Sequence, residues 1–464
     1  MFLSLALLGS VHAGSLDNIE VGGPWGSPTA TNPTALWWNP GAIAKSDGHE
    51  LFLEAAPTRA VLSLDRDNPN GGLDEVQLKG VVPFAGVTTS LGETGFGLGA
   101  GLAIPMARGG VSLNESGSGR YFLREGTIQT AAMILGGGYR WTDRFSIGVA
   151  GHLMHSSWSA KLDSETMPSL YDEIIHMDQT PNPSIYNDSN LENDRYSAAL
   201  DIGPLVDTAW TWSVGVQAHP TDKIDLGISY IHGLRLDHTG DATVNFDCPP
   251  PQDEVGRFGA ESLGVCDTSM QAHASVGYNL PYRIHAGVGL RPSESVRLEA
   301  MGGFVGWSSF QDFELSVYNV EALNNLKDPQ AADLVQQDRL WARDNQDTWF
   351  AGLDLKGQLS DKWLLGSRAL YDRSAIPDRA VTANNIDANT LTLTGLAAFS
   401  PIPRFRFGLS YTHLIAQQRV VTNSSFEMTL DPTARNEDRW FYPHGNGTYS
   451  FTAARLGLNA EIGF

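Results

Sequence analysis

The chain closes on the run TAARLGLNAEIGF, residues 452–464. Its even-numbered positions, from Thr452 through Leu456 and Leu458 to Phe464, are mostly apolar, and the residues between them are polar, charged or small. A period of two places alternate side chains on opposite faces of a β-strand. The pattern recurs at residues 145–150, 224–230, 363–372 and 405–411. It predicts an all-β chain, although a soluble sandwich would show the same alternation as a membrane barrel.

The connections between the expected strands distinguish these two folds. Short polar turns such as Gly92-Glu93-Thr94 and Ser360-Asp361-Lys362 alternate with long polar connections. The long connections lie around residues 106–125, 161–206, 248–268, 319–345 and 420–446. Short turns on one rim and long loops on the other are typical of outer-membrane barrels. A strand that ends on Phe464 also matches the usual signal for the outer-membrane assembly machinery.

We therefore predict a fourteen-stranded antiparallel transmembrane β-barrel in the bacterial outer membrane. The expected strands begin near residues 49, 76, 94, 126, 144, 207, 222, 269, 295, 346, 361, 389, 403 and 447. An even number of strands places both ends of the barrel on the periplasmic side, where the short turns lie.

The composition agrees with this assignment. Charged residues make up 18 % of the chain, against about 25 % in typical soluble domains. No run approaches the roughly 20 apolar residues that a spanning helix requires. The net charge of −21 argues against a nucleic-acid partner, because phosphate binding requires a basic face. We expect the acidic region 161–206 to be a solvated outer face, with lipopolysaccharide as its neighbour and no dedicated metal site.

The first residues and the cysteines point to export. Residues 1–13, MFLSLALLGSVHA, are expected to be a signal peptide, possibly a truncated one, since no Lys or Arg precedes the apolar run. A plain hydrophobic amino terminus is the alternative. The chain has two cysteines, Cys248 and Cys266, and an oxidising compartment favours a disulfide between them over two unpaired thiols.

A second segment, TNPTALWWNPGAIA at residues 31–44, requires a large structure around it. Trp37 and Trp38 stand between two Asn-Pro pairs, of which the second is Asn39-Pro40. Proline fixes φ and donates no hydrogen bond, so neither pair suits a central strand or a helix interior. The segment is predicted to be a compact, apolar, turn-rich plug.

On these residues the sequence resembles the FadL family of outer-membrane transporters for long-chain fatty acids and other hydrophobic compounds, which includes importers of aromatic hydrocarbons. The most specific match is 34–44, similar to the family's hatch motif, with Gly41 where the family usually has Ala. Further similar motifs are Gly119-Arg120-Tyr121, Asn279-Leu280-Pro281, Gly306-Trp307-Ser308-Ser309-Phe310, Asp347-Thr348-Trp349, Leu370-Tyr371-Asp372-Arg373-Ser374 and Gly447-Thr448-Tyr449-Ser450.

The resemblance implies three regions: a signal peptide at 1–13, a hatch at 14–48 and a barrel with long extracellular loops at 49–464. Trp37, Trp38, Asn39 and Pro40 would then belong to a hatch that blocks the lumen and contacts the cargo. The third strand would bend inward beside the hatch and open a gap in the wall. Gly97, Gly99 and Gly101 are the expected gap residues, because glycine in a strand marks a bend or a close backbone approach. The alternative is a strand packed closely against the plug.

The implied function is passive, cofactor-free uptake of long-chain fatty acids or similar hydrophobic molecules by a monomer. The ligand would be captured in a loop groove, with Tyr121, Phe122, Tyr171 and Ile174 among its lining residues, and released sideways through the wall gap. Import of small aromatic hydrocarbons or alkanes is the alternative, and an aqueous porin is a third.

Two lumen arginines, Arg368 and Arg455, are candidates for binding a ligand carboxylate, since a guanidinium binds a carboxylate with two hydrogen bonds. The alternative is a structural salt-bridge ladder. An enzyme is not expected, because no Ser lies in a nucleophile elbow.

Overall fold

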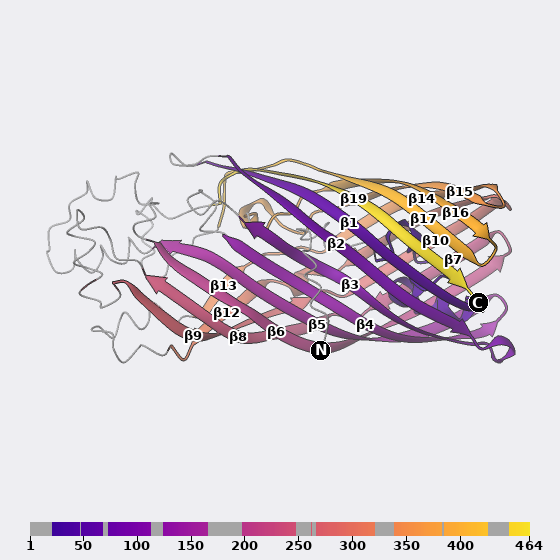
Figure 1. Cartoon of the computed structure of the whole chain (residues 1–464), viewed down its shortest axis with the longest axis horizontal. Helices are drawn as coiled ribbons and strands as arrows, with labels where there is room; N and C mark the ends of the chain where they lie inside the picture. Colours follow the sequence, from indigo (N-terminus) through magenta and orange to yellow (C-terminus); the bar gives the residue numbers. More distant parts are fainter. Residues whose placement is uncertain are drawn as a thin grey trace.

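A computed structural model describes residues 21–46, 48–67, 73–112, 124–165, 197–246, 261, 266–320, 338–382, 385–425 and 445–464. Their strands form one antiparallel sheet that closes on itself (Figure 1). Closure runs between the last and the first strand, from the pair Glu50 and Gly463 to the pair Arg66 and Gly447. The expected signal peptide lies outside the described residues.

The described part of the chain contains nineteen strand segments. They are β1 (His49–Arg66), β2 (Leu73–Ser90), β3 (Phe96–Ser112), β4 (Glu125–Thr142), β5 (Phe145–Glu165), β6 (Ser197–Thr221), β7 (Ile224–Ile231), β8 (Leu234–Phe246), β9 (Thr268–Leu280), β10 (Arg283–Ser293), β11 (Val296–Val305), β12 (Asp312–Tyr318), β13 (Asp338–Ala342), β14 (Thr348–Ser360), β15 (Trp363–Asp372), β16 (Thr390–Ile402), β17 (Phe405–Ala416), β18 (Arg419–Val421) and β19 (Gly447–Gly463).

Four of the barrel strands are interrupted, which explains the difference between nineteen segments and fourteen strands. β7 continues into β8, β9 into β10, β11 into β12 and β13 into β14, while the short β18 extends the side of β17 along β19. Below the interruptions β7 pairs with β10 and β11 with β14, and above them β8 pairs with β9 and β9 with β12. The predicted fourteen-stranded antiparallel barrel is confirmed.

The outward face of the barrel is apolar and carries two belts of aromatic side chains. Near the short turns the exposed aromatic residues are Phe96, Tyr139, Trp141, Phe145, Trp363, Phe407 and Phe464. Farther along the strands they are Trp210, Trp212, Trp349, Tyr371 and Tyr411. Such belts mark the two interfaces of an outer membrane, with an apolar band about 25 Å tall between them. Among the described residues no helix is long and apolar enough to cross a membrane.

The segment before β1 lies inside the barrel. It comprises the single turns η1 (Gly23–Trp25), α1 (Ala35–Trp38) and η2 (Pro40–Lys45), and the residues of all three turns are buried except Lys45, which is half-buried. Leu36, Trp37 and Ile43 pack in an apolar cluster with lumen-facing residues such as Ile134 and Phe350. We call residues 21–46 the hatch. The hatch occupies the half of the barrel next to the short turns, which is the periplasmic half.

A larger apolar cluster fills the outer half of the lumen. Its members include Leu62, Leu78, Trp158, Leu236, Tyr278, Phe313 and Leu315 from strands around the barrel. The connection between β15 and β16 folds into the same cluster through Ile376, Val381 and Ile386. Arg419 holds this connection in place by donating to the carbonyl groups of Ile376 and Asp387.

The contact between hatch and wall leaves no room for added atoms at several wall glycines. A Cβ at Gly148 would lie 2.1 Å from the carbonyl oxygen of Pro40, whereas a Cβ at Gly357 would meet nothing within 4 Å. Gly148→Ala is therefore expected to lower the free energy of unfolding by about 1–3 kcal/mol, and Gly357→Ala to change it by less than about 0.5 kcal/mol. Equilibrium urea unfolding in detergent micelles measures both values, and equal effects would contradict this packing.

Candidate functional site

The centre of the hatch is organised by Asn39, which is fully buried. Its side-chain oxygen accepts a hydrogen bond from the backbone N–H of Gly41 at 3.1 Å and so starts the turn η2, in which Pro40 is already preset in φ. Its amide nitrogen donates to the carbonyl oxygens of Pro28 at 2.8 Å and Val216 at 3.0 Å. The same residue therefore shapes the hatch and ties it to β6.

The two tryptophans lie against histidines of the wall. The indole N–H of Trp38 donates to the carbonyl of Val21 at 2.8 Å, which closes the hatch on itself. The ring of Trp37 meets His152 edge-on with 5.7 Å between centroids, and the ring of Trp38 lies 4.9 Å from that of His285. Both histidines are buried. The aromatic pair therefore packs against the barrel interior from β5 to β10.

Close packing explains why residue 41 is Gly, where the resemblance leads us to expect Ala. A Cβ at this position would lie 2.6 Å from the carbonyl oxygen of Gly215 on β6. Because backbone meets backbone here, only glycine fits at this separation. The hydroxyl of Ser146 donates to the carbonyl of Gly41 at 2.7 Å and holds the close approach from β5.

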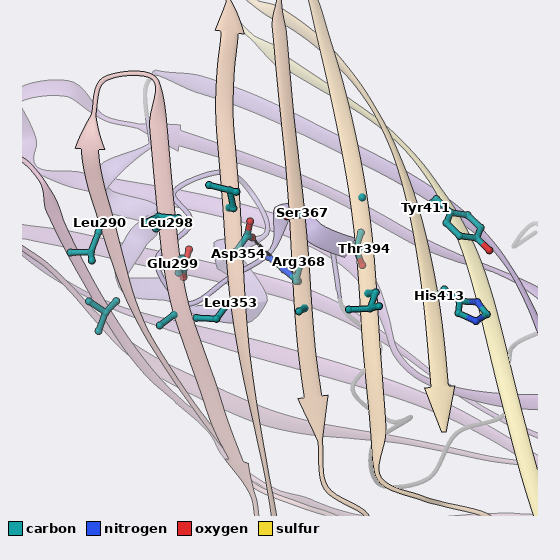
Figure 2. Close-up of a pocket in the computed structure, with 16 residues that line it drawn as sticks. Leu290, Leu298, Glu299, Leu353, Asp354, Ser367, Arg368, Thr394, Tyr411 and His413 are labelled. Atoms are coloured by element: carbon teal, nitrogen blue, oxygen red, sulfur yellow. Dashed lines mark hydrogen bonds and ion pairs between the residues drawn. The ribbon is translucent and has the colours of Figure 1, made fainter. Parts of the chain in front are cut away.

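Arg368 on β15 fixes the first turns of the hatch. Its guanidinium donates to the carbonyl oxygens of Gly23 at 3.2 Å, Pro24 at 3.0 Å and Gly26 at 2.9 Å. It also forms a 2.7 Å ion pair with Asp354, and each side chain is 1 % exposed (Figure 2). Backbone carbonyls buried away from water need donors, so Arg368 serves the hatch at this position.

Other lumen side chains also hold the hatch or form ion pairs beside it. Lys356 donates to the carbonyl of Pro24 at 2.9 Å, and Arg297 donates to the hydroxyl of Thr29 at 2.6 Å. Arg455 forms a 3.2 Å ion pair with Glu54. The structure thus places both predicted arginines, Arg368 and Arg455, in ion pairs at the level of the hatch.

The hydrogen-bonded pairing between β2 and β3 stops partway along the two strands. The two strands pair from Ser90 and Gly97 to Phe84 and Ala103, and the ladder ends there, although β3 continues to Ser112 beside β4. A bulge separates Ala103 from Met106, and Pro105 between them has no N–H to donate. Ile104 in the bulge and Ala107 beyond it pack against Ala56 and Val82, which face the lumen from β1 and β2. This part of β3 therefore lies on the lumenal side of β2; we call the unpaired stretch the β2–β3 seam.

The predicted gap residues lie below this seam. Gly97, Gly99 and Gly101 pair with β2 on one side and with β4 on the other. A Cβ at Gly97 would lie 2.5 Å from the carbonyl oxygen of Ile43, and a Cβ at Gly99 would lie 3.0 Å from the side chain of Leu36. These glycines make room for the hatch, and the interrupted pairing begins where the bulge and Pro105 remove ladder partners.

Part of the predicted site falls outside the described residues. This applies to Tyr121, Phe122, Tyr171 and Ile174, so the extracellular capture groove remains a prediction. Cys248 also lies outside them. Cys266 is disulfide-bonded, and Cys248 is the only other cysteine in the sequence.

Sequence reasoning missed several residues that hold the hatch. His285, Ser229 and Gln217 contact it, the last two through hydrogen bonds with Trp38 and with Asn39. Their alternation within predicted strands indicates which of them face the lumen, but nothing local in the sequence identifies the hatch atom that each one meets.

The family model for outer membrane protein transport proteins (OMPP1/FadL/TodX) matches residues 26–464. The fold is similar to that of a Pseudomonas aeruginosa FadL homologue, at 15 % identity over 99 % of both chains with a TM-score of 0.73. It is also similar to the P. putida toluene transporter TodX, at 13 % identity over 93 % of this chain and 94 % of that one with a TM-score of 0.66. The CymD monoaromatic hydrocarbon channel gives 15 % identity over 100 % and 99 % with a TM-score of 0.61. No curated protein sequence matches.

The contacts of Arg368 with the hatch predict that Arg368→Met lowers the free energy of unfolding strongly. The substitution leaves buried Asp354 with Lys356, at 3.3 Å, as its remaining partner and removes three hydrogen bonds to hatch carbonyls, so unfolding should become easier by about 3–5 kcal/mol. Arg406→Met is the control, because its pair with Glu461 is 36 % and 19 % exposed and contributes about 0–1 kcal/mol. Urea unfolding in micelles measures the difference.

A second measurement distinguishes a loosened hatch from a general loss of stability of the barrel. Planar-bilayer conductance of Arg368→Met should rise in transient steps as the hatch loosens, while Arg406→Met stays closed. If Arg368→Met unfolds no more easily than Arg406→Met and conducts no more, Arg368 does not hold the hatch.

Proposed function

The chain belongs to the outer membrane transport protein family OMPP1/FadL/TodX, and from this premise we propose that it takes up long-chain fatty acids or similarly apolar molecules passively and releases them sideways through its wall. Proteins of this family are hydrophobic-compound transporters of the bacterial outer membrane, not enzymes. The ligand class and the route are the parts that we propose.

The observation that carries the proposal is the combination of a closed hatch with an apolar lumen above it. Water-filled outer-membrane barrels have polar interiors. Here the outer half of the lumen contains leucines, valines and aromatic rings. An alkyl chain that enters such surroundings gains about 0.8 kcal/mol for each buried CH₂. This lumen favours an apolar solute over water and ions, which supports a transporter over an aqueous porin.

The sideways route rests on two features of the site. The hatch is hydrogen-bonded to β6, to β15 and to β11 through Asn39, Arg368 and Arg297, so movement straight towards the periplasm requires breaking many buried contacts. The β2–β3 seam starts beside the hatch, where Phe84 and Ala103 still belong to the hatch cluster. A ligand that leaves through the seam enters the bilayer without crossing the hatch. Diffusion down a gradient suffices, so no cofactor is required.

The contacts of Arg368 and Arg455 support a structural role for both. Arg368 already donates to three hatch carbonyls and pairs with Asp354, and Arg455 pairs with Glu54. We therefore assign them to holding the hatch, and we place the ligand's polar end among the extracellular loops.

Small aromatic hydrocarbons are the second candidate ligands. In the outer lumen Tyr278 lies 5.1 Å from Phe310 and 4.9 Å from Phe313, measured between ring centroids. Trp158 extends the group from β5, 6.3 Å from Phe313. Aromatic rings prefer such offset and edge contacts with other rings, so this group favours a planar ligand.

Uptake by cells that lack their own fatty-acid transporter tests the function. Cells that express the chain should accumulate labelled oleate, and more slowly, labelled toluene. Toluene uptake without oleate uptake would reassign the ligand to aromatic hydrocarbons. Large, stable conductance of the purified barrel without uptake of either compound would refute the transporter mechanism.

Bulk at the seam tests the route. Ala107→Trp adds a large ring where β3 leaves β2, and it should lower oleate uptake at least fivefold. Ala131→Trp is the control, because Ala131 on β4 is exposed on the lipid side. Both variants are first checked for the heat-modifiable migration of a folded barrel. Undiminished uptake by folded Ala107→Trp would show that the ligand leaves elsewhere.

A further inference from the structure

Two cationic side chains stand next to each other on the outward face of the wall. Arg59 on β1 and Lys79 on β2 are direct partners in the antiparallel register. Both are exposed, whereas their chain neighbours Thr58 and Leu78 are buried on the lumen side. Directly opposite residues have Cβ atoms about 4.5–5.5 Å apart, and like charges in such positions destabilise the pairing of the strands. An anion that binds both side chains would relieve this repulsion.

The described part of the chain supplies no carboxylate for this pair. Arg59 donates a hydrogen bond to the side-chain oxygen of Gln77 at 2.9 Å, and neither cation forms an ion pair with a described residue. The nearest acidic residues on this face of the two strands are Asp65 and Glu75. They lie six residues from Arg59 and four from Lys79, or ~20 Å and ~13 Å along the strands.

Other outward cations of the outer half have acidic partners. Arg235 forms ion pairs with Glu314 at 2.6 Å and with Asp237 at 2.8 Å, and Lys161 pairs with Glu125 at 3.2 Å. By contrast, the direct partner of Arg59 on its other side, in β19, is the uncharged Ala454. The Arg59–Lys79 pair is therefore open to an anion from outside the wall.

The height of the pair matches the outer boundary of the membrane. Lys79 precedes the periplasmic end of β2, Ser90, by eleven residues, and Trp349 of the outer aromatic belt precedes the end of β14, Ser360, by the same number. At ~3.3 Å per residue and a tilt of roughly 40°, eleven residues rise ~28 Å, close to the apolar band of about 25 Å. The outward residues of the intervening band are apolar, namely Leu51, Leu53, Ala55 and Pro57 on β1 and Val81, Pro83, Ala85 and Val87 on β2.

We propose that Arg59 and Lys79 bind one phosphate group of lipopolysaccharide, the phosphorylated lipid of the outer leaflet. A phosphate monoester carries a charge of about −1.5 to −2 at pH 7, so it can balance both cations, whereas a carboxylate carries a single charge. A guanidinium and an ammonium offer several N–H donors to its oxygens, and hydrogen bonds between charged groups are the stronger ones.

The site lies beside the β2–β3 seam. The pairing of β2 with β3 ends at Phe84, and Lys79 stands five residues farther out along the unpaired edge of β2. A lipid held by the pair would cover this edge from the membrane side. The competing occupant is the carboxylate of a fatty acid that leaves through the seam, and uptake measurements distinguish the two.

Neutralising both cations tests the site. Arg59→Gln combined with Lys79→Gln removes two positive charges from exposed positions. Arg144→Gln combined with Lys161→Gln is the matched control, because it removes the same two kinds of charge from exposed residues away from the pair. Both proteins are first checked for the heat-modifiable migration of a folded barrel. They are then extracted from outer membranes in mild detergent with EDTA, so that divalent cations cannot bridge the lipid to carboxylates, and native mass spectrometry identifies the retained lipid.

Wild type and the control should each retain about one lipopolysaccharide molecule per barrel, and the Arg59→Gln, Lys79→Gln variant at least about fivefold less. Lipopolysaccharide stripped of its phosphates should rebind to wild type as weakly as intact lipid rebinds to this variant. Equal retention by all three proteins, or equal rebinding of the stripped and intact lipid, would overturn the proposal.

Uptake of labelled oleate should be the same for the variant and the control, which keeps this result independent of the transport mechanism. Lower uptake by the variant with unchanged lipid retention would overturn the proposal and assign the pair to the carboxylate of the leaving ligand. If the double variant does not fold, Lys79→Gln alone is compared with Lys161→Gln alone, with the same expected difference in retained lipid.

Discussion

The structure depends on the need to fill a lumen that the wall cannot fill itself. The interior of an eight-stranded barrel is just wide enough for its own side chains, and fourteen strands enclose considerably more space. The hatch occupies that space in the periplasmic half, but it brings turn-rich backbone into a buried interior. Each buried carbonyl then requires a donor. Arg368 and Lys356 supply donors from the wall, and Asn39 supplies one from the hatch itself.

Much of this architecture could be predicted from the sequence, because its causes are local or periodic. Because lipid covers one face of every strand, apolar residues alternate with polar or small ones, as in residues 405–411. The short turns on one rim and the long loops on the other identify the membrane barrel. The hatch followed from the two Asn-Pro pairs around Trp37 and Trp38, which fit neither strand nor helix. The partners of these residues could not be predicted. Arg368 meets Gly23 across 345 positions, and alternation shows only that it faces inward.

The glycines of β3 show how one sequence pattern can have two structural causes. Small residues in a strand have two physical explanations, an opening in the wall and a close neighbour, and sequence alone does not separate them. At Gly97 and Gly99 the neighbour is the hatch. The pairing with β2 ends instead beyond Ala103, where a bulge and the missing N–H of Pro105 interrupt the ladder. The glycines and Pro105 are close together in the sequence. The glycines make room for the hatch, whereas Pro105 interrupts the pairing farther along the same strand.

The two apolar clusters divide the inner face of the wall into an outer part and a part at the level of the hatch. The outer cluster contains the lumen-facing Leu78 and Met106, whereas Phe84 and Ala103, farther down the same two strands, belong to the hatch cluster. The β2–β3 seam therefore begins at the boundary between them. Below this boundary a hydrophobic solute meets the ion pairs of Arg368 and Arg455, whose partners it cannot replace, and above it the solute meets hydrocarbon. We infer that the cost of separating those charges makes the seam the easier exit, because leaving sideways disturbs no buried ion pair.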